Sequence, residues 1–278
     1  MKHLEQIITN SRGVNLFYQE WLPDEAERSA ILLLHGFGEH SSRYQELAEH
    51  LVSKGISLHA FDYQGHGRSE GKRGVFHFFS HLYHDIDQIA GVVLSKNPRK
   101  FGVLGHSLGG LLALGWALRF HGELDAVIVS SPLLGLSLDI PLWKKLASKA
   151  FSHLLPWVTF RATVDPRLLT HDPRKVAEYA TDPLVHQDAN GQLFYGMIKE
   201  AEFVNESAKR FHYPLLLLLA GEDHIVDVST SLRFYENAAS QLKKCRVYEG
   251  WYHEIFNELE RAKLFRDLTH WLEGVLLR

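Results

Sequence analysis

The sequence is poor in cysteine and has no long apolar run, and both shortages narrow the class of protein. Its one cysteine, Cys245, cannot form a disulfide within the chain, which is typical of proteins from a reducing compartment. The longest apolar run, Leu215 to Ala220, is far shorter than the about 20 residues that a membrane-spanning helix needs. The first residues also lack the apolar stretch of a secretory signal. We therefore expect a cytoplasmic protein, with peripheral contact to a membrane as an open alternative.

The chain also lacks an excess of charge of either sign. It has 30 Lys and Arg against 33 Asp and Glu, which gives no reason to expect nucleic acid as a partner. Hydrophobic residues make up 45% and charged residues 23%, the balance of a soluble globular protein. A length of 278 residues is ordinary for a single α/β domain. Nothing in the composition indicates an oligomeric state.

Short apolar runs alternate with amphipathic segments, which is the pattern of a mostly parallel sheet with helices on both faces. Core strands are predicted at 31–34, 56–61, 101–104, 126–130, 214–220 and 245–248, and an antiparallel edge strand at 14–21. Helices are predicted at about 44–53, 81–95, 108–121, 230–239 and 259–277. The sequence therefore predicts an α/β fold.

Residues 133–212 interrupt this alternation, because they contain no convincing buried strand. We expect a helical cap inserted after the sixth strand, over a core of residues 1–132 and 213–278. An apolar stripe at helical spacing runs along the cap, formed by Leu142, Leu146, Ala150, Phe151, Leu154 and Leu155. Two interpretations stay open: the stripe packs on the core, or it belongs to a lid that contacts lipid.

The segment Gly105-His106-Ser107-Leu108-Gly109 matches G-x-S-x-G, the nucleophile elbow of α/β-hydrolases. It follows the strand predicted at 101–104 and begins a predicted helix, as the elbow requires. A serine on such a tight turn has a strained backbone, and glycine two residues before and after it avoids clashing side chains. The N–H groups at the start of the helix favour a developing negative charge. We predict Ser107 as a nucleophile.

A second glycine-rich turn, His35-Gly36-Phe37-Gly38, directly follows the strand predicted at 31–34. An H-G-x-G turn that leaves a strand can present a backbone N–H to a substrate oxyanion. The predicted oxyanion hole consists of the Phe37 N–H and the N–H of Leu108, the residue after the nucleophile. Alone this motif is weak, because such turns are common, but the elbow strengthens it.

A serine hydroxyl needs a base to take its proton, and the base needs an acid to orient it. In α/β-hydrolases the acid and then the base follow the serine along the chain. Asp223 follows the strand predicted at 214–220 and His253 follows the next strand, so both emerge at the same sheet edge as Ser107. We predict Asp223 as the acid and His253 as the base. The alternatives are Asp227 and Glu222 for the acid, and His224 and His270 for the base.

Three histidines, His77, His81 and His84, have helical spacing that a metal site can use. No cluster of partner ligands is evident in the sequence, so a solvated helix face is the favoured interpretation. We expect neither a metal nor an organic cofactor.

Taken together, these motifs make the chain resemble the monoacylglycerol lipase and lysophospholipase group of α/β-hydrolases, which is serine aminopeptidase S33-like. The resemblance runs nearly from end to end and is carried by residues 35–44 (HGFGEHSSRY), 62–71 (DYQGHGRSEG), 105–110 (GHSLGG), 181–184 (TDPL) and 248–253 (YEGWYH). The block that follows the oxyanion turn, GEHSSRY, is the narrowest of these. The cap departs from the better-known lipases across most of 134–170, so acyl-chain length and head group stay open.

The resemblance implies a serine ester hydrolase that acts on a small-molecule lipid ester. It implies that Glu39, Arg43 and Tyr179 lie near the polar glycerol end of the substrate. An ion pair that braces the loop explains Glu39 and Arg43 equally well, and packing under the cap explains Tyr179. Aromatic and basic side chains of the cap also suit contact with a membrane surface, namely Trp143, Lys144, Lys145, Lys149, Trp157 and Arg161.

Three other functions stay open. The first is general carboxylesterase activity. The second is a proline iminopeptidase, which needs acidic residues in the cap to bind a free amino terminus, such as Glu200, Glu202 and Glu206. The third is a ligand-binding protein that keeps the fold without turnover, because fold alone does not fix function.

Overall fold

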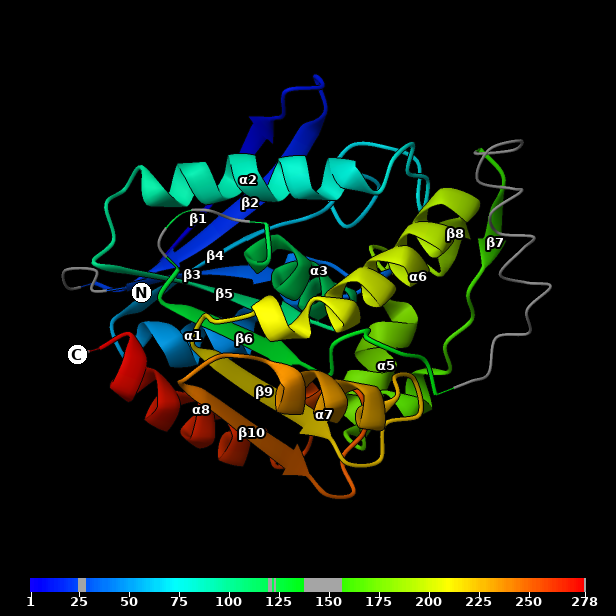
Figure 1. The fold of residues 1–278 in the computed structure, drawn as a ribbon. Coiled ribbons are helices and arrows are strands. Elements are labelled where there is room, and N and C mark those ends of the chain that lie inside the picture. Colours follow the sequence, from blue (N-terminus) through cyan, green and yellow to red (C-terminus); the bar gives the residue numbers. More distant parts are fainter. Residues whose placement is uncertain (25–28, 120–121, 123, 138–156, 278) are drawn as a thin grey trace.

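The computed structural model describes residues 1–24, 29–119, 122, 124–137 and 157–277, and an eight-stranded sheet runs through its centre (Figure 1). The strand order is β1-β2-β4-β3-β5-β6-β9-β10. The strands are β1 (Lys2–Thr9), β2 (Asn15–Leu22), β3 (Ser29–Leu34), β4 (Ile56–Phe61), β5 (Lys100–His106), β6 (Ala126–Ser130), β9 (Leu215–Ala220) and β10 (Lys243–Tyr248). Neighbours from β4 to β10 are parallel, whereas β1 with β2 and β2 with β4 are antiparallel.

Helices cover both faces of this sheet, because the buried strands are apolar on both sides. In β3, Ala30, Leu32 and Leu34 pack into one hydrophobic core, and Ile31 and Leu33 pack into the other. Helices α2 (Ser80–Leu94), α3 (Leu108–Ala117) and α7 (Val228–Asn237) contribute to the first core. Helices α1 (Gln45–Val52) and α8 (Arg261–Val275) contribute to the second, and Figure 1 shows the two layers on opposite sides of the sheet. The α/β prediction is confirmed.

The predicted core strands and helices are all present, with shifts of a few residues at their ends. The strand predicted at 14–21 is antiparallel as expected, but it is not the edge, because β1 pairs on its outer side. Nearly every side chain of β1 is exposed, so this strand leaves no alternating apolar pattern in the sequence. The helix predicted at 108–121 ends at Ala117, and residues 120 and 121 lie outside the described part of the chain.

The inserted segment lies at the carboxyl ends of the parallel strands, where the arrowheads of β9 and β10 point in Figure 1. It contains the helices α5 (Pro173–Thr181) and α6 (Gly191–Glu206) and a two-stranded antiparallel ribbon of β7 (Thr159–Arg161) and β8 (Asp188–Asn190). The expectation of no buried strand is wrong at β8, where two of three residues are buried. Three residues are too short to show an alternating pattern. The apolar stripe of Leu142 to Leu155 lies outside the described residues, as does Trp143.

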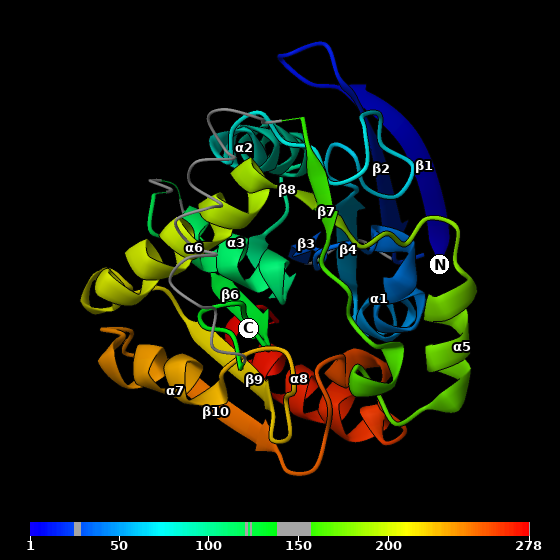
Figure 2. The same ribbon diagram turned by 90° about the vertical axis from the view of Figure 1, so that its right-hand side faces the viewer.

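Side-chain caps fix where the helices around the site begin. Asp172 accepts the Arg174 N–H at the start of α5, and Asn190 accepts the Leu193 N–H at the start of α6. Figure 2 shows α5 beside α1 and α6 beside α3, so the inserted helices stand over two different parts of the core. Within the described ranges, no helix has both the length and the apolar composition needed to cross a membrane.

Candidate active site

Ser107 lies on a strained turn between β5 and α3. Its backbone angles are φ 53° and ψ −115°, in a region that residues other than glycine rarely adopt. A Cβ atom on Gly105 would overlap the carbonyl oxygen of Gly109, and one on Gly109 would overlap the carbonyl oxygen of Leu34. Both glycines of the elbow are therefore required by close backbone packing. Ser107 itself is 8% exposed at the carboxyl end of β5.

Asp223 and His253 lie in the loops after β9 and β10 and contact each other directly. The Nδ1 atom of His253 lies 2.7 Å from Oδ2 of Asp223. The other carboxylate oxygen, Oδ1, accepts the backbone N–H groups of Ile225 (2.8 Å) and Val226 (2.9 Å). Three hydrogen bonds thus fix the Asp223 carboxylate, and the carboxylate in turn fixes the tautomer and orientation of the ring.

The electrostatics of this pair suit a base that works near neutral pH. Burial alone would lower the pKa of His253, but the charge and hydrogen bond of Asp223 outweigh burial and raise it above its usual 6.5. Burial would likewise raise the pKa of Asp223, yet His253 and the loop N–H groups lower it. In the described part of the chain no hydrogen bond joins the Ser107 hydroxyl to His253, a contact that often forms fully only with substrate bound.

The alternative acids and bases have other partners. Asp227 accepts the N–H groups of Ser229 and Thr230 and caps α7. Glu222 lies 3.7 Å from His224, on side chains that are both more than one-third exposed. His270 belongs to α8. Of the three candidate acids, Asp223 is the one that contacts His253.

The turn after β3 and the elbow each contain one of the two predicted oxyanion donors, Phe37 and Leu108. Gly38 adopts φ 73°, and the Gly36 N–H donates to Oε1 of Glu39 at 2.6 Å, which holds the turn in place. Within the described residues, neither the Phe37 N–H nor the Leu108 N–H donates a hydrogen bond. Both N–H groups thus meet one requirement of the predicted oxyanion hole, which needs donors without another partner.

Glu39 and Arg43 form a buried ion pair and belong to a larger cluster. Arg43 Nη1 lies 2.7 Å from Oε2 of Glu39, and both Arg43 nitrogens donate to Glu254 at 2.7 Å. The Arg43 guanidinium carbon lies 4.9 Å from the centre of the Tyr179 ring. The structure thus brings the three residues predicted near the substrate together. Glu254, directly after His253, is a member that the sequence analysis misses.

Comparison with known proteins places this arrangement in a family. The family model described as "Serine aminopeptidase, S33" matches residues 25–260, most of the chain. The chain belongs to this family of α/β-hydrolases.

Relatives of this S33 hydrolase include lipases from distant organisms. A monoacylglycerol lipase of Mycolicibacterium smegmatis is 31% identical over 265 residues, which covers 94% of this chain and 93% of that protein. The monoglyceride lipase of Homo sapiens is 30% identical over 271 residues, covering 95% and 89%. The crystal structure of the Paleococcus ferrophilus monoacylglycerol lipase superimposes with a TM-score of 0.86 at 33% identity, covering 93% of this chain and 98% of that one.

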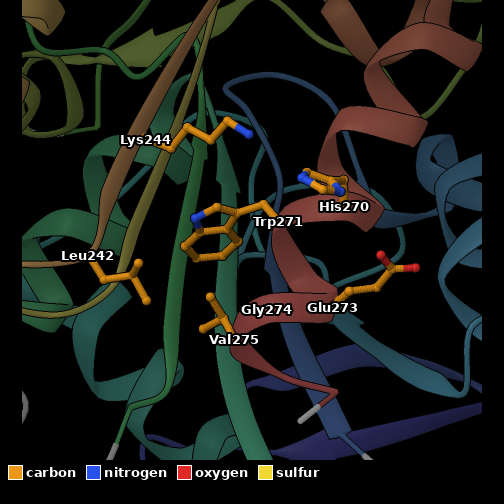
Figure 3. A pocket seen from close by; sticks show the side chains of 7 residues that line it. All are labelled: Leu242, Lys244, His270, Trp271, Glu273, Gly274 and Val275. Carbon is orange, nitrogen blue, oxygen red and sulfur yellow. The ribbon is translucent and has the colours of Figure 1, made fainter.

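One cavity in the described part of this hydrolase lies away from Ser107. Its volume is about 450 Å³, and Figure 3 shows it between the start of β10 and the last turns of α8. The loop that carries His253 follows the other end of β10. It is lined by Leu242, Lys244, His270, Trp271, Glu273, Gly274 and Val275. We look for the reaction at Ser107 rather than in this cavity, because the strained serine and the Asp223–His253 pair lie at the carboxyl ends of the strands.

The histidines considered for a metal lie around the start of α2. His77 precedes this helix and His81 and His84 belong to its first turns, with His77 and His84 exposed. The described residues of the chain include no group of three or more His, Cys, Asp or Glu side chains arranged to hold a metal ion.

Proposed function

We propose that this S33 hydrolase cleaves carboxylic esters of lipids through an acyl-enzyme on Ser107, with a monoacylglycerol or a lysophospholipid as substrate. One observation carries the proposal: a strained serine and a hydrogen-bonded Asp223–His253 pair emerge at the same edge of the sheet. The relatives named as monoacylglycerol lipases, similar over nearly the whole chain, support the substrate class.

In the proposed reaction, His253 takes the proton of Ser107 while the serine oxygen attacks the ester carbonyl. Asp223 stabilises the imidazolium that forms. The N–H groups of Phe37 and Leu108 bind the carbonyl oxygen as it becomes negative. The alcohol then leaves with the proton from His253. Water attacks the acyl-enzyme with His253 as its base, which releases the fatty acid and restores Ser107.

We propose a division of the chain into a core, residues 1–132 and 213–278, and a cap, residues 133–212, that shelters the acyl chain. Each buried methylene of the chain contributes about 0.8 kcal/mol to binding, so chain length should tune affinity strongly. The polar end of the substrate then lies toward Glu39, Arg43 and Tyr179. These side chains are buried and already paired with one another, which supports a fixed polar end of the pocket.

A peptidase with this fold is a weaker candidate, because two of the three cap carboxylates considered for it, Glu200 and Glu202, are otherwise engaged. Glu200 is held by both nitrogens of Arg119, at 2.7 and 3.0 Å. Glu202 pairs with Lys199 at 2.6 Å on the exposed side of α6. A free amino terminus would have to displace these partners to bind Glu200 or Glu202, which leaves the exposed Glu206.

The first test compares wild type with Ser107→Ala on long-chain monoacylglycerols, lysophospholipids and short p-nitrophenyl esters. We expect the long-chain lipids to be cleaved fastest and Ser107→Ala to lose about 10⁴-fold or more in kcat. Ser231→Ala, a buried serine on α7, is the matched control and should keep full activity. If the enzyme cleaves only the short esters, the lipid substrate class is wrong and a general carboxylesterase is the remaining interpretation. No turnover, combined with labelling of Ser107 by a serine-hydrolase probe, would point to the peptidase, and no labelling to a binding protein.

We also propose a cytoplasmic enzyme that touches a membrane through its cap. Trp157 is 61% and Phe160 41% exposed, and Arg161 beside them is also exposed. Aromatic and basic side chains together suit the interface of an anionic bilayer. Co-sedimentation with anionic vesicles that is unchanged in Trp157→Ala would exclude this contact.

A further inference from the structure

A buried cluster of two glutamates and one arginine lies beside His253, and we call Glu39, Arg43 and Glu254 the clamp. Arg43 binds Glu254 with both terminal nitrogens and Glu39 with one, all at 2.7 Å. The three side chains are between 5% and 9% exposed. Bidentate arginine–carboxylate pairs of this kind are among the strongest and most directional hydrogen-bonded contacts in proteins.

The clamp joins three parts of the proposed site. Glu39 accepts the Gly36 N–H at 2.6 Å and so holds the turn that carries Phe37. Glu254 follows His253 in the chain, and its backbone N–H donates to the carbonyl of Leu169 in the inserted segment at 2.7 Å. Arg43 connects the two glutamates, so the oxyanion turn and the His253 loop are held at a fixed separation.

The clamp also carries an excess of negative charge. Burial would raise the pKa of both glutamates, but Arg43 outweighs it: the pKa of Glu39 falls to about 2, and that of Glu254 is lowered as well. Burial would lower the pKa of Arg43, and the two carboxylates instead raise it. With all three groups ionised, two negative charges face one positive charge at neutral pH.

The other titratable groups around His253 leave this excess uncancelled. Asp223, in the loop after β9, is a further carboxylate and lies 2.7 Å from Nδ1 of His253. The ring of His106 lies 4.9 Å from that of His253, and burial lowers the pKa of His106 to about 4, so it is neutral at pH 7. Arg43 is therefore the one cation of this group, and it is shared by two carboxylates.

We propose that Glu254 is a positioning residue of this hydrolase, one that holds the His253 loop against the oxyanion turn and whose charge stabilises the His253 imidazolium. The proposal rests on the proposed function for its kinetic consequence, but not for its effect on the ring. When His253 accepts the proton of Ser107, the uncompensated negative charge of the clamp favours the protonated ring. Glu254 acts through its own charge and through the loop that its contact with Arg43 holds, without contact to the substrate.

The test combines Glu254→Gln with Glu254→Asp and a matched control. Gln keeps an acceptor for Arg43 but removes the charge, and Arg43 stays paired with Glu39, so the variant should fold. Asp keeps the charge but is too short for the bidentate contact. Glu200→Gln makes the same change of charge in another bidentate pair, between Glu200 on α6, which is 8% exposed, and Arg119, which is 40% exposed.

Two measurements test the role of Glu254 separately from the proposed ester hydrolysis. The protonation of His253 is followed by NMR titration of the labelled ring, which needs no substrate, and kcat/KM is measured against pH. In Glu254→Gln we expect the His253 pKa and the acid limb of kcat/KM to move down by about 0.5 to 1 unit, because a nearby negative charge is lost. The kcat at the optimum should fall by up to about tenfold. Glu254→Asp should keep the wild-type pKa yet lose kcat, and Glu200→Gln should match wild type in both.

A His253 titration that is the same in Glu254→Gln and wild type would overturn the charge effect, and an unchanged kcat in both Glu254 variants would overturn the positioning role. If the NMR shift appears while no ester is cleaved by any variant, the clamp is supported and the proposed substrate class fails. An equal pKa shift in Glu200→Gln would mean that general destabilisation is the cause, and it would also overturn the proposal.

Discussion

The two ends of the central sheet are built differently. At the carboxyl ends of the strands, Ser107 and Gly38 have positive φ angles of 53° and 73°, and buried charges lie against each other. At the opposite end of β10, an open cavity of about 450 Å³ is lined by residues with ordinary backbone angles, among them Lys244 and His270 (Figure 3). The residues that line this cavity thus have no positive φ angle, and within the described residues they form no buried ion pair.

This difference shows which features indicate chemistry. A surface cavity costs little and arises wherever a helix end and a strand end diverge. Three features of the Ser107 site are each unfavourable alone: the strained serine, the arginine shared by two glutamates, and the histidine whose pKa is raised although burial lowers it. Such features persist where the surrounding structure holds them in place. At the Ser107 site, the strained backbone and the buried charges indicate chemistry more clearly than the volume of a cavity does.

The largest effect should come from the acid at the carboxyl end. Asp223→Asn should lower kcat by roughly 10⁴-fold, because the amide no longer stabilises the imidazolium or its tautomer. Asp227→Asn, four residues further along the same loop, is the control. Asn caps a helix as well as Asp does, so kcat should stay near wild type. Ester hydrolysis assays measure both, and a large loss in Asp227→Asn with retained activity in Asp223→Asn would assign the acid to Asp227.

A smaller effect should come from the backbone of the oxyanion turn. In Gly38→Ala, a Cβ at φ 73° would overlap the carbonyl oxygen of His186 in the inserted segment. The backbone N–H of His186 also donates a hydrogen bond to the Gly38 carbonyl, so the substitution would disturb this contact. Gly13→Ala has nearly the same φ, 78°, with nothing within 4 Å of the added atom. Gly13→Ala should lose about 1–2 kcal/mol of unfolding free energy from strain alone.

Gly38→Ala should lose more stability and up to about 10² in kcat, because the Phe37 N–H moves with the turn. Urea unfolding and ester hydrolysis compare the two variants. Equal losses of stability with unchanged kcat in both would show that the contact between the inserted segment and the turn has no part in catalysis.

The predictions for the carboxyl end of the sheet rest on patterns that are local in the sequence. The elbow around Ser107 and the loop positions of Asp223 and His253 follow from local rules: glycine at tight turns and polar residues directly after apolar strands. The α/β order follows from the alternation of apolar runs. Each of these patterns is complete within about ten residues of chain, so no tertiary information is needed.

The sequence does not predict contacts between residues that are far apart in the chain, nor strands that are exposed or very short. Arg43 and Glu254 are 211 positions apart, and nothing near either residue indicates that one pairs with the other. The edge strand β1 is exposed along nearly its whole length, and β8 has only three residues, so neither shows a strand-like period. The sequence leaves two interpretations open for Glu39 and Arg43, substrate contact or an ion pair that braces the loop, and the structure shows the ion pair.

The smallest effect should come from the cavity at the opposite end. Lys244→Ala and His270→Ala change the lining of this cavity but leave the strained Ser107 turn and the clamp unaltered. The kcat/KM should therefore stay within about twofold of wild type. Assays with the best ester from the first test measure this. A loss of tenfold or more, with unfolding free energy unchanged, would mean that the helix α8 transmits changes from this cavity to the His253 loop. The two ends of the sheet would then be coupled, and volume as well as strain would have to be counted as a sign of function.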